Sequence, residues 1–339
     1  MDPKIAEQGR KTLRSFMIPA IPDWGYLYFA LAVTSAICYI FRCVFVHVDC
    51  GWSMTSLGGY ALYMPLITLA TLIIPTAVMS SGNSERIVGN FTGIGPILTG
   101  LFSGVALMLL SSAMHNLVVM LWTSLRIDMI FPAYFYRTEL DSVPITLFEV
   151  LTDSIIPGIG IVLFFCGLLW SSFKLTDRTI GYFIIGLLFA LYQLNIVDFA
   201  FMFVLGAWLA FVRTKSRNIW APLACLIGMR ITEIFFGSSL ETVDITTIQT
   251  YSDIEMTYFY SSLPALFMGI VLLFFFMRIL SDFYNSYSIG LHSNLTLAPE
   301  ADDDDSGRHS ILEGIRPPLI VGMIVWVIVW GFVIEGAHI

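Results

Sequence analysis

Six polar residues that are able to bind a metal ion or carry a proton lie within or beside long apolar stretches of the sequence. They are His115, Glu149, Asp153, Gln193, Asn195 and Asp198. Glu149 and Asp153 are four residues apart, so a helix through them places both carboxylates on one face. Imidazole and carboxylate groups that share one cavity can bind zinc and activate water. In the simpler alternative, Glu149 and Asp153 lie near the exterior end of a span, within reach of water, and His115 forms a hydrogen bond inside the bundle.

The elements that hold these residues are expected to be membrane-spanning helices, because the composition is far from that of a soluble protein. Hydrophobic residues make up 57% of the 339-residue chain, and charged residues only 12%. Such a mixture is typical of a chain that is dissolved mostly in lipid. Each span must satisfy its own backbone hydrogen bonds within the hydrocarbon. We therefore expect an all-α fold, a polytopic transmembrane helix bundle.

Apolar runs of about twenty residues, the length that crosses a hydrocarbon core of about 30 Å, recur along nearly the whole sequence. They predict about nine spans. The expected spans are residues 25–46, 56–79, 93–122, 146–173, 179–194, 197–212, 219–236, 262–281 and 318–334. The fifth and sixth are short and are separated by little more than Asn195 and Ile196, which predicts a tight helical hairpin.

The basic residues predict the orientation, because short loops rich in lysine and arginine stay in the cytoplasm. With the N-terminus inside, most of the basic residues near span ends fall on the cytoplasmic side, among them Arg178, Arg213 and Lys215. The net charge of −8 is concentrated in a few places. One is the run from Asp302 to Asp305 before the last span, where we expect a solvated linker rather than a calcium site.

The sequence divides into three expected regions. N-terminal transmembrane helices occupy residues 1–145, a core occupies residues 146–236, and C-terminal transmembrane helices with an acidic loop at 283–316 occupy residues 237–339. Within the core, Arg230 and Glu233 are three residues apart and are expected to neutralise each other. The sequence contains no basic, aromatic-rich surface of the kind that binds nucleic acid.

Several short motifs occur in order between residues 146 and 230. They are F-x-G-L-L at 165–169, an apolar helix at 186–194, a glycine-containing helix at 203–211, R-T-x-S at 213–216 and W-x-P at 220–222. Their order and spacing resemble the core of the CAAX-protease and bacteriocin-processing family of intramembrane metalloproteases. The resemblance implies a CAAX-protease-like core at 146–236. We expect an integral protein of the plasma membrane of a prokaryote, with the N-terminus in the cytoplasm.

Where that family places its chemistry, this sequence has other residues. The resemblance implies a metal ion that is held by glutamate and histidine side chains and activates water. The family's paired glutamates, arginine, two histidines and asparagine correspond here to Ile161, Val162, Cys166, Gln193, Leu226 and Arg230. Aliphatic side chains have no lone pair for a metal, and glutamine is a poor substitute for imidazole at zinc. No shift of register restores the first motif, since adjacent glutamates occur nowhere in the sequence.

We therefore expect a catalytically inactive pseudoprotease, without a cofactor, that acts as an intramembrane scaffold or regulator. Its expected partners are the lipid bilayer and another membrane protein, such as a membrane enzyme, a sensor kinase or a processing machine. The amide of Gln193 is expected to bridge neighbouring helices. One alternative is an active CAAX-type metalloendopeptidase whose zinc ligands have moved to the six polar residues. The other is a small-solute transporter that uses polar residues of the third to fifth spans.

Overall fold

The computed structural model describes residues 22–47, 66–79, 87–90, 93–124, 155–173, 178–193, 197–237, 256–293 and 315–336. Within these residues the chain is helical, apart from short turns and one isolated antiparallel bridge between Gly89 and Asn218. Two of the elements, η1 and η4, are π-helices. The elements are α2 (Trp24–His47), η1 (Leu69–Ile73), α4 (Ile74–Met79), α6 (Ile94–Ser124), α8 (Ile156–Ile161), η4 (Val162–Leu169), α9 (Trp170–Ser172), α10 (Arg178–Tyr192), α11 (Phe199–Ser216), α12 (Trp220–Phe236), α13 (Met256–Ser293) and α15 (Pro317–Gly336).

Helices occur at each of the expected spans, so the prediction of an all-α fold is confirmed for the described residues. Three segments are long and apolar enough to cross a membrane, namely Ile94–Trp122, Phe199–Ser216 and Tyr258–Ser286. Shorter apolar helices occur at Trp24–Cys38, Leu66–Met79, Ile156–Ser172, Thr179–Tyr192 and Pro317–Gly331. These helices indicate an integral membrane protein, while the number of nine crossings stays a prediction.

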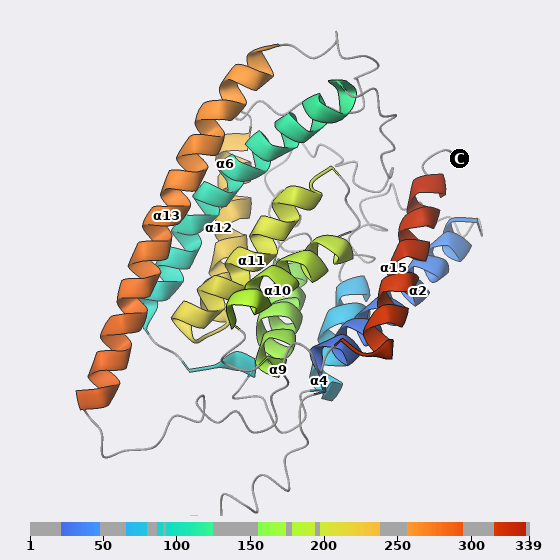
Figure 1. Ribbon diagram of the computed structural model, residues 1–339, viewed down its shortest axis with the longest axis horizontal. Coiled ribbons are helices and arrows are strands. Elements are labelled where there is room, and N and C mark those ends of the chain that lie inside the picture. Colours follow the sequence, from blue (N-terminus) through green and yellow to red (C-terminus); the bar gives the residue numbers. More distant parts are fainter. Residues whose placement is uncertain are drawn as a thin grey trace, which may run out of the picture.

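Two of the helices are longer than the membrane is thick. With a rise of about 1.5 Å per residue, the 31 residues of α6 extend over roughly 46 Å and the 38 residues of α13 over roughly 57 Å. The hydrocarbon core of a bilayer measures only about 30 Å. Figure 1 shows the two helices running along each other on one side of the bundle. Each of them must tilt in the membrane or extend beyond it.

Glycine allows α6 and α12 to pack with their backbones in contact. Gly100 and Gly104 of α6 lie against α12, and Gly228 of α12 lies against α6. A β-carbon on Gly104 would lie 2.8 Å from the carbonyl oxygen of Cys225, and one on Gly228 would lie 2.8 Å from the carbonyl carbon of Leu101. Small residues four positions apart, such as Gly100 and Gly104, are favoured between membrane helices. The reason is that van der Waals contact, rather than the hydrophobic effect, holds such helices together.

Glycine contacts also join α10 to α11. A β-carbon on Gly186 of α10 would lie 2.6 Å from the carbonyl oxygen of Phe203, and one on Gly206 of α11 would lie 2.8 Å from Cβ of Phe189. At these glycines the two backbones are in contact, with no side chain between them. The two helices therefore lie side by side near the middle of the bundle (Figure 1).

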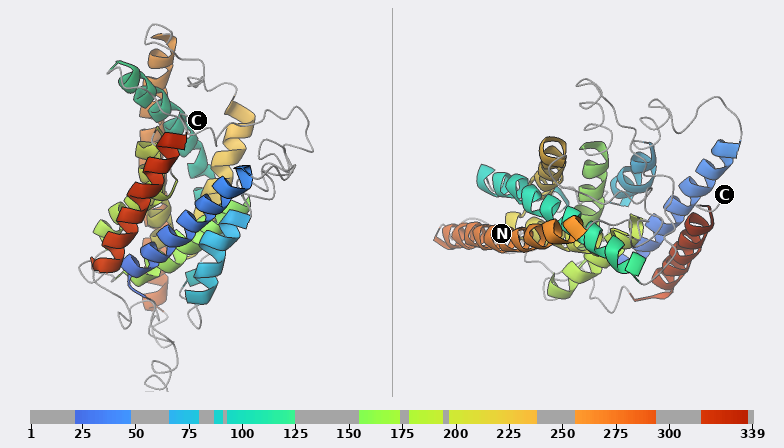
Figure 2. Two further views of the ribbon diagram at one scale, coloured as in Figure 1. Left: turned by 90° about the vertical axis from the view of Figure 1, so that its right-hand side faces the viewer. Right: turned by 90° about the horizontal axis from the view of Figure 1, so that it is seen from above.

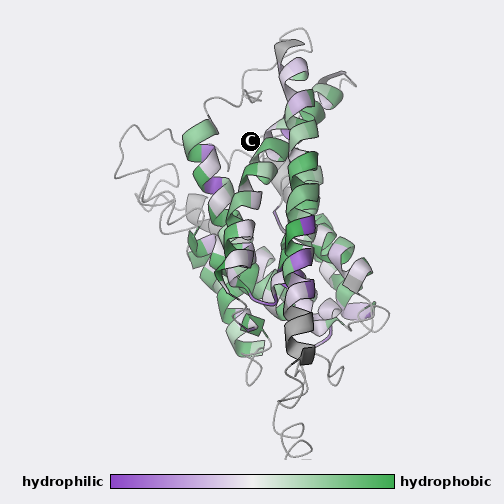
Figure 3. Cartoon of the chain, turned by 90° about the vertical axis from the view of Figure 1, so that its left-hand side faces the viewer, coloured by the Kyte–Doolittle hydropathy of each residue, from purple (hydrophilic) through white to green (hydrophobic). Residues whose placement is uncertain are grey.

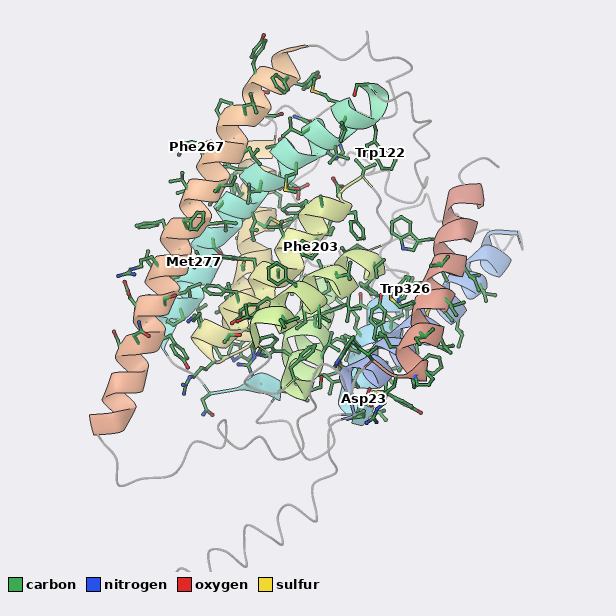
Figure 4. All side chains as sticks on the ribbon, viewed as in Figure 1. Asp23, Trp122, Phe203, Phe267, Met277 and Trp326 are labelled. Carbon is green, nitrogen blue, oxygen red and sulfur yellow. The ribbon has the colours of Figure 1, made fainter. Side chains whose placement is uncertain are left out.

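The first and last described helices, α2 and α15, form a pair. Arg316 Nη1 lies 3.5 Å from Asp23 Oδ2, although 293 positions separate the two residues. Trp24 of α2 stacks on Phe173 at the end of α9, with 5.8 Å between ring centroids. Figure 2 shows the pair along one side of the molecule, and Figure 4 shows Trp326 on the side of α15 that faces the bundle. The helix pair thus closes the bundle opposite α13.

Hydrophobic residues run along most of the length of the helices (Figure 3), and many of their side chains are exposed on the outside of the bundle. On α13 the exposed set includes Phe267, Phe274 and Phe275, which are 67%, 62% and 58% exposed. Such a face is stable in contact with lipid and unfavourable in water. The interior is apolar as well, and Phe164 and Phe189 are among its fully buried side chains. A helix that is apolar on all sides is expected in a membrane.

Candidate functional site

The residues that correspond to the family's first motif lie on one continuous helical segment with an irregular turn. α8 begins with Pro157 in its first turn and passes directly into the π-helix η4. π-helical turns are rare and often occur at functional sites. Val162 and Cys166 lie in η4 and are 1% and 0% exposed, and Ile161 packs at the edge of the same core. These side chains are part of the hydrophobic interior.

The structure brings three motif-bearing segments together. Phe165 of η4 contacts the rings of Phe189 and Tyr192 in α10, with centroid distances of 5.3 and 5.7 Å. On the other side, a β-carbon on Gly158 of α8 would lie 3.5 Å from Cδ1 of Leu226 in α12. The helices that resemble the family's motif blocks therefore surround one region of the bundle. Aromatic and aliphatic side chains fill that region.

Next to Leu226, Cys225 takes part in a small buried hydrogen-bonded group that joins three helices. Ser103 Oγ of α6 donates to the carbonyl oxygen of Gly100 at 2.7 Å. Trp208 Nε1 of α11 donates to the same Oγ at 3.2 Å, and Cys225 Sγ lies 3.2 Å from it. When Ser103 donates its proton to Gly100, the Cys225 thiol can donate to the Ser103 oxygen. This cysteine therefore contributes to packing between α6, α11 and α12.

Gln193, at the position of a family histidine, follows the last turn of α10. Its backbone N–H donates to the carbonyl oxygen of Phe189 at 3.1 Å. Its side chain is partly buried. The part of the chain that the structure describes provides no hydrogen-bond partner for the side-chain amide, so the expected bridge between helices stays a prediction.

Two of the six polar residues singled out in the sequence meet in the structure. His115 Nδ1 of α6 lies 2.8 Å from Asp198 Oδ1, at the start of α11, and both side chains are about one-fifth exposed (18% and 20%). The neighbouring Asn116 donates from Nδ2 to Ser262 Oγ of α13 at 3.0 Å. Glu149, Asp153 and Asn195 lie outside the described residues. Within the described residues, these polar groups connect helices.

Arg230 and Glu233 form the ion pair that their spacing predicted. Arg230 Nη1 lies 2.6 Å from Glu233 Oε2, and the two side chains are 13% and 24% exposed. Both residues lie near the end of α12 that is opposite the α11–α12 turn. The guanidinium at the position of the family's asparagine is therefore neutralised by a neighbour on its own helix.

Sequence reasoning missed an anchor in the R-T-x-S motif. Arg213 is 7% exposed and donates from Nη2 to the carbonyl oxygen of Ile87, at 3.2 Å. The backbone adds two bonds between the same segments, from Asn90 N to Arg217 O and from Ile219 N to Val88 O, both at 3.1 Å. The motif therefore fastens residues 87–90 to the end of α11. The sequence does contain one indication of this anchor. Arg213 follows an apolar run and has no acidic neighbour in the sequence that could neutralise it.

The turn between α11 and α12 is closed by its own side chains. Arg217 is in the left-handed region, with φ at 56°, and its N–H donates to the carbonyl oxygen of Arg213 at 2.9 Å. Asn218 Oδ1 accepts from Ala221 N, and Asn218 Nδ2 donates to the Ser216 carbonyl oxygen, both at 3.0 Å. Such bonds satisfy backbone groups that a helix end leaves free. The motif's role in this structure is to end one span and begin the next.

The zinc that the family resemblance implies does not fit the residues at the corresponding positions. Ile161, Val162 and Leu226 carry no atom that could bind a metal, and they pack against other apolar side chains. Among the described residues, no group of three or more His, Cys, Asp or Glu side chains could hold a metal ion. The His115–Asp198 pair provides two of the donor types that zinc accepts.

Comparison with known proteins identifies one family. Residues 143–232 match the family model of the type II CAAX prenyl endopeptidases, described as Rce1-like. The match covers about a quarter of the chain and agrees closely with residues 146–230, where the sequence motifs occur, so the resemblance is confirmed for this segment. No curated protein and no solved structure matches the chain. The chain is thus a helical membrane protein with a segment similar to Rce1-like CAAX prenyl endopeptidases.

Proposed function

We propose that this protein is a catalytically inactive relative of the Rce1-like endopeptidases, and that it acts as an intramembrane scaffold or regulator of another membrane protein. One observation carries the proposal. The positions at which the family resemblance implies paired glutamates and a histidine are occupied by Ile161, Val162 and Leu226, and all three pack in the apolar core.

The chemistry of hydrolysis supports this conclusion. A zinc protease needs at least three ligands with lone pairs and an open position for water. Phe164, Phe165 and Phe189 are buried around the first-motif segment, and their rings offer no hydrogen bond to a catalytic water. Arg230 stands on α12 at the position of the family's asparagine, where its guanidinium pairs with Glu233 and has no lone pair to offer a metal.

A scaffold needs the features that the bundle retains. Glycine contacts hold α6 to α12 and α10 to α11 in one arrangement, and the Arg213 anchor fastens residues 87–90 to that core. The broad apolar face of α13 remains available to lipid or to helices of a partner in the same membrane. A membrane enzyme, a sensor kinase or a processing machine would be a partner of this kind.

The second candidate is an active intramembrane metalloendopeptidase with relocated ligands. The 2.8 Å contact between His115 and Asp198 favours it, because imidazole and carboxylate are both zinc ligands. This reading requires a third ligand from residues such as Glu149 or Asp153. A small-solute transporter is less favoured, because Asn116 and His115 bond to neighbouring helices rather than to one another along a path.

A peptidase assay separates the two candidates. Detergent-purified protein is incubated with a prenylated CAAX peptide, with and without a zinc chelator. We expect no cleavage above that of a boiled sample, and no effect of the chelator. The proposal fails if the native chain cleaves the peptide, the chelator stops the cleavage, and His115→Ala abolishes it. The matched control is Asn116→Ala, which would still cleave the peptide in that case. Both variants change adjacent residues of α6, so a general loss of folding would affect both.

A further inference from the structure

Two basic side chains at the end of α11 lie against one aromatic ring of α13. Lys215 Nζ is 4.8 Å from the ring centroid of Tyr284, and Arg217 Cζ is 5.0 Å from it. Arg217 Nη2 also donates to Tyr284 Oη, at 3.4 Å. Cation–π contacts attract a cation to the face of a ring. The ring therefore holds two positive charges at one place on the surface.

These two charges reinforce each other. Because both groups lie within 5.0 Å of the same centroid, they are no more than about 10 Å apart, which is one Debye length at 0.1 M salt. Asp282, two residues before Tyr284, pairs with Arg278 at 3.7 Å. Lys215 has no acidic partner among the described residues. The ring of Tyr284 thus brings two cationic groups within reach of a single anion.

Both helices place this cluster at the boundary between hydrocarbon and water. Lys215 lies in the last turn of the candidate span Phe199–Ser216, and Tyr284 lies in the last turn of the candidate span Tyr258–Ser286. Lys215 Nζ is also 5.7 Å from the Phe211 ring, so its apolar stem follows the span while its charge lies at the span's end. Nearby in sequence, Trp220 is 49% exposed, as is typical of residues at the lipid headgroups.

We propose that Lys215, Arg217 and Tyr284 bind the phosphate of an anionic phospholipid such as phosphatidylglycerol. Arginine binds phosphate oxygens with its planar fork, lysine adds a compact charge, and the tyrosine hydroxyl can donate a further hydrogen bond. The basic end of the bundle is the end that the positive-inside rule places on the cytoplasmic side, where anionic lipids gather. The proposal does not depend on whether the protein is a protease.

A different reading of the same residues makes a different prediction. Basic groups in the last turn of a helix interact favourably with the helix dipole and orient the protein in the membrane without binding any particular lipid. In that case, the loss of any nearby basic residue would lower the preference for phosphatidylglycerol over phosphatidylcholine by a similar factor. Comparison of the cluster variant with a variant of another nearby basic residue therefore distinguishes a site from a general positive charge.

The test is a lipid titration of the full-length protein in detergent micelles. Quenching of tryptophan fluorescence by brominated phosphatidylglycerol and by brominated phosphatidylcholine gives the relative affinity for the two lipids. We expect the native chain to prefer phosphatidylglycerol, and a Lys215→Gln/Arg217→Asn variant to lose about 30-fold of that preference, at about 1 kcal/mol for each basic residue. Asparagine tolerates the left-handed backbone of position 217, so the turn is kept.

Two further variants complete the experiment. Arg278→Gln removes one positive charge from the same part of α13, but that side chain is 82% exposed and paired with Asp282, so we expect less than about a threefold change. Tyr284→Leu keeps both charges and removes the ring that holds them, and it should reduce the preference several-fold.

Three results would overturn the proposal. The first is equal affinity of the native chain for both lipids, and the second is an equal loss in Arg278→Gln and in the double variant. The third is displacement of phosphatidylglycerol by millimolar inorganic phosphate, which would assign the site to a soluble anion. A double variant that elutes as an aggregate is replaced by Lys215→Gln alone, for which we expect about a fivefold loss.

Discussion

Replacing Gly228 by alanine is expected to force α12 away from α6 and to destabilise the bundle. A β-carbon at this position would lie 2.8 Å from the carbonyl carbon of Leu101 and closer still to its oxygen, whereas ordinary contacts lie at 3.4–4 Å. The obstacle is backbone, so no side-chain rotation relieves it. The helices must separate by at least about 0.6 Å along this contact, and tightly packed interiors resist such a shift.

The expected cost follows from three contributions. Overpacking of a tight contact costs about 1–3 kcal/mol. The same shift loosens the neighbouring backbone contacts at Gly100 and Gly104, and a close contact of this kind between helices is worth about 0.5–1 kcal/mol. Alanine returns up to about 1 kcal/mol, because glycine is the poorer helix former. We therefore expect Gly228→Ala to lower the free energy of unfolding by roughly 2 kcal/mol, within a range of about 1–4 kcal/mol.

Unfolding by increasing fractions of sodium dodecyl sulfate in mixed micelles measures this difference. Gly331→Ala is the matched control, because it makes the same substitution within α15, where no atom lies within 4 Å of the added β-carbon. The control should leave the protein unchanged or stabilise it by up to about 1 kcal/mol. If the two variants differ by less than about 0.5 kcal/mol, the described contact between α6 and α12 is wrong.

Three further predictions concern the polar residues, the degenerate site and the orientation. Asn116→Leu removes the hydrogen bond to Ser262 between α6 and α13 and should cost about 0.6–1.7 kcal/mol in the same unfolding assay; no change would mean that the bond is absent in micelles. Gln193→His should produce neither zinc binding nor cleavage of a membrane substrate, because the paired carboxylates would still be missing, and chelator-sensitive cleavage by this variant would refute the pseudoprotease. Cys50, which lies outside the described residues, should react with a membrane-impermeant maleimide in intact cells. A cysteine at the exposed position 90, introduced as Asn90→Cys together with Cys50→Ser, should react only after the cells are permeabilised. The reverse labelling pattern would invert the orientation of the protein in the membrane.

The apolar runs of the sequence predicted the positions of the helices well, but they predicted the lengths of the helices less well. The run at residues 262–281 marks part of α13, but the helix extends from Met256 to Ser293. Hydropathy identifies the part that lies in lipid, and a helix can continue into water where its residues favour it. The π-helix at Val162–Leu169 left no sign in the sequence, because a continuous apolar run has the same appearance whichever helical turn it forms.

The contacts of the candidate site were less predictable, because they join residues that are far apart in the sequence. His115 and Asp198 meet across 83 positions, and Arg213 binds Ile87 across 126. The predicted topology placed His115 and Asp198 toward the same side of the membrane, which made their meeting foreseeable. Nothing comparable indicated the partner of Arg213, since a backbone carbonyl has no signature in a sequence. Arg230 and Glu233, three residues apart on one helix, were paired correctly for that local reason.

The zinc content of the purified protein tests the central claim most directly. Membranes are solubilised in mild detergent, the protein is passed through gel filtration in zinc-free buffer, and metal is measured per chain. An inactive scaffold predicts less than about 0.1 zinc per chain, because Ile161, Val162 and Leu226 offer no lone pair to a metal. About one zinc per chain, lost in both His115→Ala and Asp198→Asn, would contradict the account and assign the metal to a relocated catalytic site.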